Sequence, residues 1–162
     1  MRSLLFITLL TTLSCSTDTL IHRIEKLGIH EFKTISYGLR GDVEWYTYYF
    51  EDGTTYVWTY DRKTDSFNFD THPQKDHAIT ELCDINAYAD KVRTNIESLN
   101  VSMISQSPWP GNLIRFWVSN TKFICYVNPD FKFDSDAKRR WLSELKTGEK
   151  VRDNWYSVTI DD

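Results

Sequence analysis

The sequence lacks the features that identify several common classes of enzyme and nucleic-acid-binding protein. It contains no G-x-S-x-G, H-E-x-x-H or P-loop pattern, so no nucleophile elbow, zinc-protease helix or phosphate-binding loop is indicated. Its 19 basic residues face 23 acidic ones, and this balance disfavours binding to nucleic acid. The apolar run at residues 4–13 is shorter than the roughly 20 residues that span a bilayer.

Patterns typical of metal sites are also missing. His72 and His77 are five residues apart with Asp70 and Asp76 nearby, but this spacing matches no zinc motif. Residues 128–136 contain three aspartates without the glycine that a calcium loop needs at its bend. We therefore expect no metal and no other cofactor.

The N-terminus has the pattern of an export signal. Met1-Arg2 is followed by the short apolar run, which ends at Ser14-Cys15, and a basic start with small residues after an apolar core is typical of secretory signals. A signal that ends at a cysteine resembles the bacterial lipoprotein class, although Thr12 and Leu13 replace the Leu and small residue usual in that class. The resemblance covers residues 1–15 and implies lipid attachment at Cys15 and a lipid-anchored protein of the bacterial envelope, facing the periplasm.

Two alternatives to lipidation remain open. Cleavage after Ser14 or Ser16 would leave a secreted protein without lipid, and the apolar run could instead be a buried strand of a cytosolic protein. Under the lipoprotein interpretation, residues 1–14 are the signal peptide, 15–19 a short lipid tether and 20–162 one α+β domain. The 148 residues that follow the signal are enough for one sizeable core.

Cysteine is scarce, with three in the chain. If Cys15 carries the lipid, Cys83 and Cys125 remain as a pair, and an exported protein permits a disulfide between them. The alternative is two buried thiols, since cysteine also packs as a small apolar residue.

Two similar segments predict helix-to-strand junctions at residues 23–32 and 95–104. In each, a leucine (Leu27, Leu99) ends an apolar stripe, and Gly28 or Asn100 follows at a position that suits a positive φ. The first helix has its stripe at Leu20, Ile24 and Leu27. The second has the longest stripe, at Ile79, Leu82, Ile85, Ala89, Val92, Ile96 and Leu99.

Strands and a third helix complete the expected fold. The predicted strands are residues 30–37, 43–50, 54–60, 66–70, 101–106, 112–118, 121–127 and 154–160. A third helix is expected over 135–147, with Gly148 ending it. The order α-β-β-β-β-α-β-β-β-α-β predicts an α+β protein whose antiparallel meanders are covered by helices on one face, either as two related halves or by chance likeness of short segments.

Aromatic residues are abundant, at 15% of the chain. In residues 44–50 rings occur on both faces of one strand, and the next strand continues one row. Helices on one face leave the other face open, so exposed rings could bind sugars or a protein. The alternative is ordinary cross-strand pairing. The row considered for binding is Tyr46, Tyr48, Tyr56, Trp58 and Tyr60.

Trp109 is a further candidate for binding, because it lies between two prolines in residues 107–112. Such a stiff loop could present its ring to a partner, or fold the ring back over the core. The basic cluster at 138–140 is expected to be the solvated face of a helix.

These patterns favour a lipid-anchored, non-catalytic protein-binding module, such as an enzyme inhibitor or an envelope assembly factor. A glycan-binding module that uses the tyrosine-rich sheet is the first alternative. A small hydrolase whose site the sequence does not reveal is the second.

Overall fold

The structure is a computed structural model that describes residues 17–51, 53, 55–69, 85–106, 110–132, 136, 139 and 148–160. In this part of the chain, two longer helices accompany a sheet of nine strands, and every pair of neighbouring strands is antiparallel. The prediction of an α+β fold is confirmed.

The helices are residues 17–27, called here the N-terminal helix, and α3 (Ile85–Leu99), with a short 3-10 helix η1 (Ile29–Phe32). The strands are β1 (Ile35–Arg40), β2 (Val43–Tyr49), β3 (Thr55–Asp61), β4 (Ser66–Phe69), β5 (Met103–Ser105), β6 (Leu113–Trp117), β7 (Lys122–Val127), β8 (Gly148–Arg152) and β9 (Trp155–Thr159).

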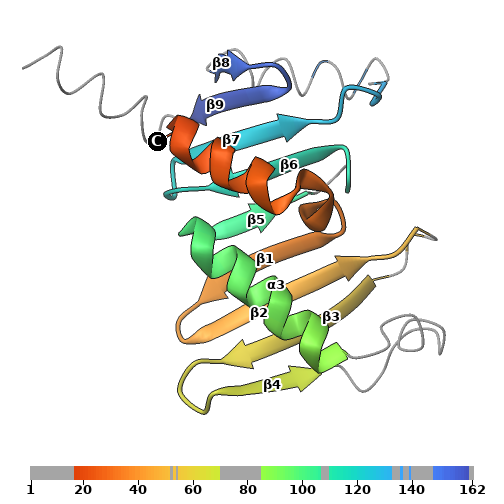
Figure 1. Ribbon diagram of the computed structural model, residues 1–162, viewed down its shortest axis with the longest axis vertical. Coiled ribbons are helices and arrows are strands. Elements are labelled where there is room, and N and C mark those ends of the chain that lie inside the picture. The colour runs from red at the N-terminus through yellow and green to blue at the C-terminus, as the bar shows by residue number, and fades with distance from the viewer. Residues whose placement is uncertain are drawn as a thin grey trace, which may run out of the picture.

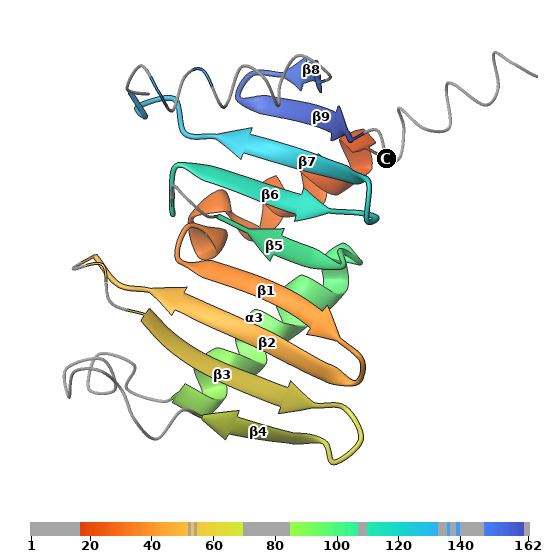
Figure 2. The ribbon, with the colours of Figure 1, turned by 180° about the vertical axis from the view of Figure 1, so that it is seen from behind.

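Strands β1 and β5 are neighbours at the centre of the sheet. The strand order is β4-β3-β2-β1-β5-β6-β7-β9-β8, so the first half (β1–β4) runs one way and the second half (β5–β9) the other. The N-terminal helix and α3 both lie against the same face, in front of the sheet in Figure 1 and behind it in Figure 2. Each half thus begins with a helix, and the relatedness of the halves stays a prediction.

Both helix ends have the predicted backbone. Gly28 has φ 93° and Asn100 has φ 55°, which are conformations that glycine and asparagine adopt more readily than other residues. The apolar stripes end there and face the sheet. Described stripe residues with at most 8% exposure are Leu20, Ile24, Ala89, Val92, Ile96 and Leu99.

Parts of the predicted stripe lie outside the described residues. These are Ile79, Leu82 and the side chain of Ile85. For the buried part, each fully buried Val, Leu or Ile side chain contributes roughly 1.5–3 kcal/mol, so burial of the stripe stabilises the packing of α3 on the sheet.

The chain after Gly28 differs from the expectation. The predicted strand at 30–37 begins later, because residues 29–32 form η1 and the strand occupies Ile35–Arg40. The turn buries Phe32, at 2% exposure.

The C-terminal part departs from the predicted order. Gly148 starts strand β8 at the edge of the sheet, where the sequence indicated only a helix end. An edge strand needs no apolar alternation, and charged residues such as Glu149 and Lys150 are typical of protected edges. The predicted third helix falls almost entirely outside the described residues.

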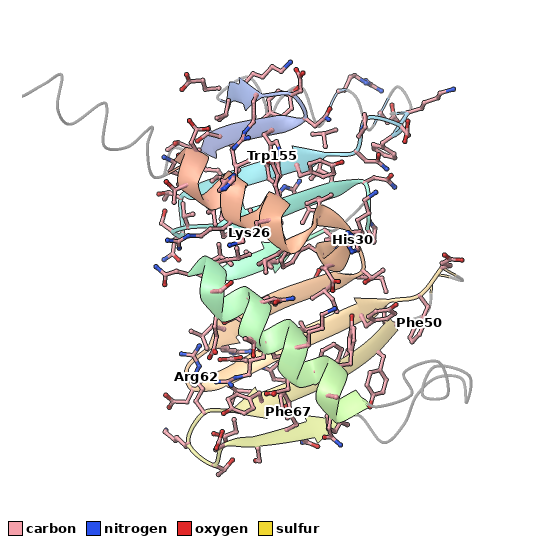
Figure 3. All side chains as sticks on the ribbon, viewed as in Figure 1. Lys26, His30, Phe50, Arg62, Phe67 and Trp155 are labelled. Atoms are coloured by element: carbon pink, nitrogen blue, oxygen red, sulfur yellow. The ribbon has the colours of Figure 1, made fainter. Side chains whose placement is uncertain are left out.

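Two cores lie on opposite faces of the sheet. The larger one is between the helices and the sheet, and includes Trp58, Phe116 and Ile124. Trp155 belongs to it and donates its indole N–H to Glu25 of the N-terminal helix, at 3.1 Å (Figure 3). The smaller core is on the other face of the second half, formed by Leu113, Phe123, Cys125 and Val158, each at most 2% exposed.

Candidate functional site

The five rings considered for binding lie on the helix side of the sheet. Tyr46 pairs with Trp58 across β2 and β3, and their rings stack with centroids 5.2 Å apart. Tyr56 and Tyr60 are 3% and 5% exposed, and Tyr48 packs against the same core. The cross-strand alternative therefore describes this row, which is core and is not available to a partner.

The opposite side of the first half is exposed. We call this surface the open face. None of its side chains is buried, and no described helix lies over it (Figure 2). It consists of Ser36, Gly38, Val43, Trp45, Thr47, Tyr49, Val57, Thr59 and Asn68.

Trp45 is the outstanding residue of the open face. It is 48% exposed, although it lies in the middle of β2. Within the described part of the chain its indole makes no hydrogen bond and no ring contact. A large ring held by a rigid strand and left in water is typical of an interface anchor.

Trp45 borders a shallow hollow of about 540 Å³. On the open face this hollow is lined by Val43, Trp45, Val57, Thr59 and Asn68. A second hollow of about 330 Å³ is lined by residues that include Gly38, Met103 and Trp117. Among the described residues that line these two hollows there is no acidic, histidine, lysine or cysteine side chain, so this part of the chain places no pair of titratable groups for acid–base catalysis there.

The described residues also contain a buried carboxylate, Glu44 of β2, whose side chain is 1% exposed. It accepts hydrogen bonds from the Tyr46 hydroxyl and from Arg62 Nε, the latter at 2.6 Å, and Arg93 Nε lies 3.7 Å away. The Arg93 guanidinium is 3.9 Å from the centre of the Tyr60 ring. The cluster joins β2, β3 and α3, and Figure 3 shows Arg62 beside the helix.

This cluster fits a structural role better than a catalytic one. Burial, and then the hydrogen bond to Glu44, raise the pKa of Tyr46, so its hydroxyl remains a donor. The carboxylate oxygens of Glu44 accept hydrogen bonds from protein donors. Because its side chain is only 1% exposed, a substrate could not reach it. No sequence pattern indicates this cluster, because Tyr46, Arg62 and Arg93 come from segments far apart from one another.

Of the other predicted site residues, the structure describes only some. Cys125 is buried on β7, but Cys83 lies outside the described residues, as do Cys15 and Trp109, so the disulfide, the lipid and the binding loop stay predictions. Over the described ranges, no group of three or more His, Cys, Asp or Glu is placed to hold a metal ion. Among these residues, no helix is long and apolar enough to cross a membrane.

Comparisons with known proteins provide no information on function, so the interpretation depends on the geometry. No family model matches the chain, and no similar curated protein or solved structure was found.

Proposed function

We propose that this chain is an exported binding protein that recognises a protein partner through the open face and catalyses no reaction. The observation that carries the proposal is Trp45, exposed and without a hydrogen bond or ring contact in the described residues. Trp is enriched at the energetic centres of protein interfaces, since its rigid ring buries much area at little entropic cost. An enzyme inhibitor or an envelope assembly factor would use such a surface.

The remainder of the open face supports binding over catalysis. Val43 and Val57 give it apolar area, while Thr47, Thr59 and Asn68 surround Trp45 with uncharged polar groups. This mixture of an apolar centre and polar surroundings is the usual anatomy of an interface. The sheet holds these groups rigidly, so docking would order few side chains.

We propose further that a lipid on Cys15 anchors the protein to the envelope. Residues 17–19, which were predicted to be part of a tether, belong to the N-terminal helix, so one residue, Ser16, lies between Cys15 and the described part of that helix in the sequence. Two residues extend roughly 7 Å at most. The body would then rest against the headgroups. The N-terminal helix begins at the side of the molecule where β9 ends (Figure 1), so the open face would look sideways along the membrane.

A glycan ligand is a second candidate, and the surroundings of Trp45 favour it specifically. An exposed indole among threonine and asparagine side chains can stack on a sugar and hydrogen-bond its hydroxyls. A glycan array probed with the wild type and with Trp45→Ala would reveal this activity. Binding that requires Trp45 would move the proposal from a protein to a carbohydrate.

Site-specific photo-crosslinking in living cells tests the protein partner. A photo-reactive residue at Asn68, exposed on the open face, should yield one discrete adduct with a protein partner. The same residue at Asp90, exposed on α3, is the matched control and should yield none. Identical adducts from both positions, or none from Asn68, would refute binding through the open face.

Metabolic labelling tests the anchor separately. An alkyne fatty acid should label the wild type and not Cys15→Ala. Equal labelling of the two proteins would remove the lipid from this account while leaving the open face untouched.

A further inference from the structure

A projection and a recess lie side by side on the open face. Trp45 of β2 is directly opposite Gly38 of β1 in the strand register. A Cβ atom placed on Gly38 would meet no heavy atom within 4 Å. Gly38 is also not among the glycines with positive φ, so neither its backbone nor its packing requires glycine. The missing side chain leaves a recess beside the exposed ring.

The recess has an apolar border on its far side. Gly38 is opposite Met103 of β5, and Met103 is opposite Trp117 of β6. The Trp117 ring is fixed, because its Nε1 donates to Ser105 Oγ at 3.0 Å and it packs on Phe123. A ring entering the recess would therefore meet preformed apolar walls.

We propose that a second copy of this chain covers the open face in a two-fold symmetric dimer, with Trp45 of each copy seated over Gly38 of the other. The inference rests on the proposed function, because it names the protein that the open face binds. A two-fold interface requires a self-complementary surface, on which residue i meets residue j and j meets i. Trp45 and its neighbour Gly38 are such a pair.

The sheet geometry permits this arrangement. Two sheets pack face to face about 10 Å apart with strands within about 30° of each other. A two-fold axis that runs between β1 and β2, along the strands, places β1 of one copy over β2 of the other at the same level. Each pair of sheets would then have helices on both outer sides, in four layers.

Two charged residues at the rim of the open face, Arg40 and Asp61, would come close to each other across the same two-fold axis. Arg40 is exposed, and it has no ion pair among the described residues. It shares one cross-strand row with Val43 and Asp61. The axis places Arg40 over Val43 of the second copy, one strand from that copy's Asp61. Two symmetric pairs of opposite charge would form, while the centre of the interface contains no charged side chain.

The size of the surface sets the expected strength. The axis superposes the six strands from β4 to β6, which have three to seven residues each. At about 3.3 Å per residue and about 4.8 Å between strands, they give roughly 500 Å² on each copy. Two copies would bury roughly 1,000 Å², which is at the lower end of specific interfaces. A micromolar dimer is expected, populated where anchoring concentrates the protein on a membrane.

Native mass spectrometry of the full chain, extracted in detergent and titrated in concentration, tests the dimer. The wild type should show a monomer–dimer equilibrium, and Trp45→Ala should weaken it by about 30-fold or more, as loss of an interface anchor does. Gly38→Leu should do the same by filling the recess, and its ordinary backbone allows the fold to persist. Ile160→Ala, which removes another exposed apolar side chain, is the matched control and should dimerise normally.

Circular dichroism and thermal melting verify that each variant remains folded. A wild type that is monomeric throughout the titration, or a dimer indifferent to both variants, overturns the inference. If the wild type is monomeric but Asn68 crosslinks to a different protein, the proposed function survives and the second copy is the wrong occupant. If the wild type is monomeric and Asn68 crosslinks to nothing, both proposals fall.

Discussion

The face of the sheet opposite the N-terminal helix and α3 differs between the two halves of the molecule. One cross-strand row passes through all nine strands on this face, with polar Asn68 and Thr59 toward one end and apolar Met103, Trp117, Phe123 and Val158 beyond the centre. In the first half the row is exposed or half-buried, and in the second half Phe123 and Val158 are at most 2% exposed. The row is Asn68, Thr59, Trp45, Gly38, Met103, Trp117, Phe123, Val158 and Gly148.

Two tryptophans in this row show what the difference means. Trp45 and Trp117 each lie one strand away from the central pair of strands, at the same level. Beyond Trp117 comes Phe123, with ring centroids 4.7 Å apart, whereas beyond Trp45 comes Thr59, which gives no ring to pack on. The same residue type is thus part of a core in one half and of a surface in the other.

Phe123→Ala and Thr59→Ala form the first test of this comparison, with the largest expected effect. Removing the buried ring should lower the free energy of unfolding by about 3–5 kcal/mol, because a cavity adds to the lost burial. Thr59→Ala should change it by less than about 0.5 kcal/mol, as surface substitutions do. Urea titration of both variants measures the difference, and similar losses would show that the open face is packed in solution.

The polar cluster on the helix side gives the second test. Glu44→Gln should destabilise the protein by about 1–3 kcal/mol, since it leaves Arg62 and Arg93 without their buried carboxylate, and both are only partly screened by water. Glu97→Gln removes a more exposed partner of Arg93 and should cost less than about 0.5 kcal/mol. Hydrogen exchange should locate the loosening in the first half. Equal effects of the two substitutions would contradict a special role for Glu44.

Much of the fold could be predicted from local patterns. The strands at 43–49 and 122–127 and the two junctions follow from alternation and from residues that tolerate positive φ. Strand β8 could not, because an edge strand with Glu149 and Lys150 carries no apolar alternation. The short helix η1 depends on packing of Phe32 that no local pattern reveals.

The open face was harder to find, because rings occupy both faces of β2. Tyr46 and Trp45 are equally aromatic neighbours, so β2 alone does not indicate which faces the core. Strand β3 held the missing signal: Tyr56, Trp58 and Tyr60 alternate with Val57, Thr59 and Asp61. In an antiparallel pair the polar row marks the solvent face, and the register then assigns Trp45 to it.

Alkaline unfolding gives the third test, because burial raises the pKa values of Tyr37 and Tyr46 on the helix side of the first half. A raised pKa means that the unfolded state loses the proton first, so stability is complete below about pH 10 and falls as pH rises further. Each such tyrosine steepens the decline by up to about 1.4 kcal/mol per pH unit. Tyr37→Phe should flatten the curve measured by urea titration at several pH values. An unchanged slope would show that Tyr37 titrates normally.

The smallest expected effect belongs to Trp45, and it decides whether the two halves really differ. Trp45→Ala should change the free energy of unfolding by less than about 0.5 kcal/mol, because its ring has no ring contact or hydrogen bond in the described residues. Trp117→Ala, the matched substitution across the centre, should cost about 1–3 kcal/mol, because it removes the packing on Phe123 and leaves Ser105 without its donor. Both are measured by urea titration at a protein concentration low enough to keep the chain monomeric. A large loss from Trp45→Ala under those conditions would place the ring in the monomer's own core. A small loss, together with weakened association, is what a side chain reserved for binding should give.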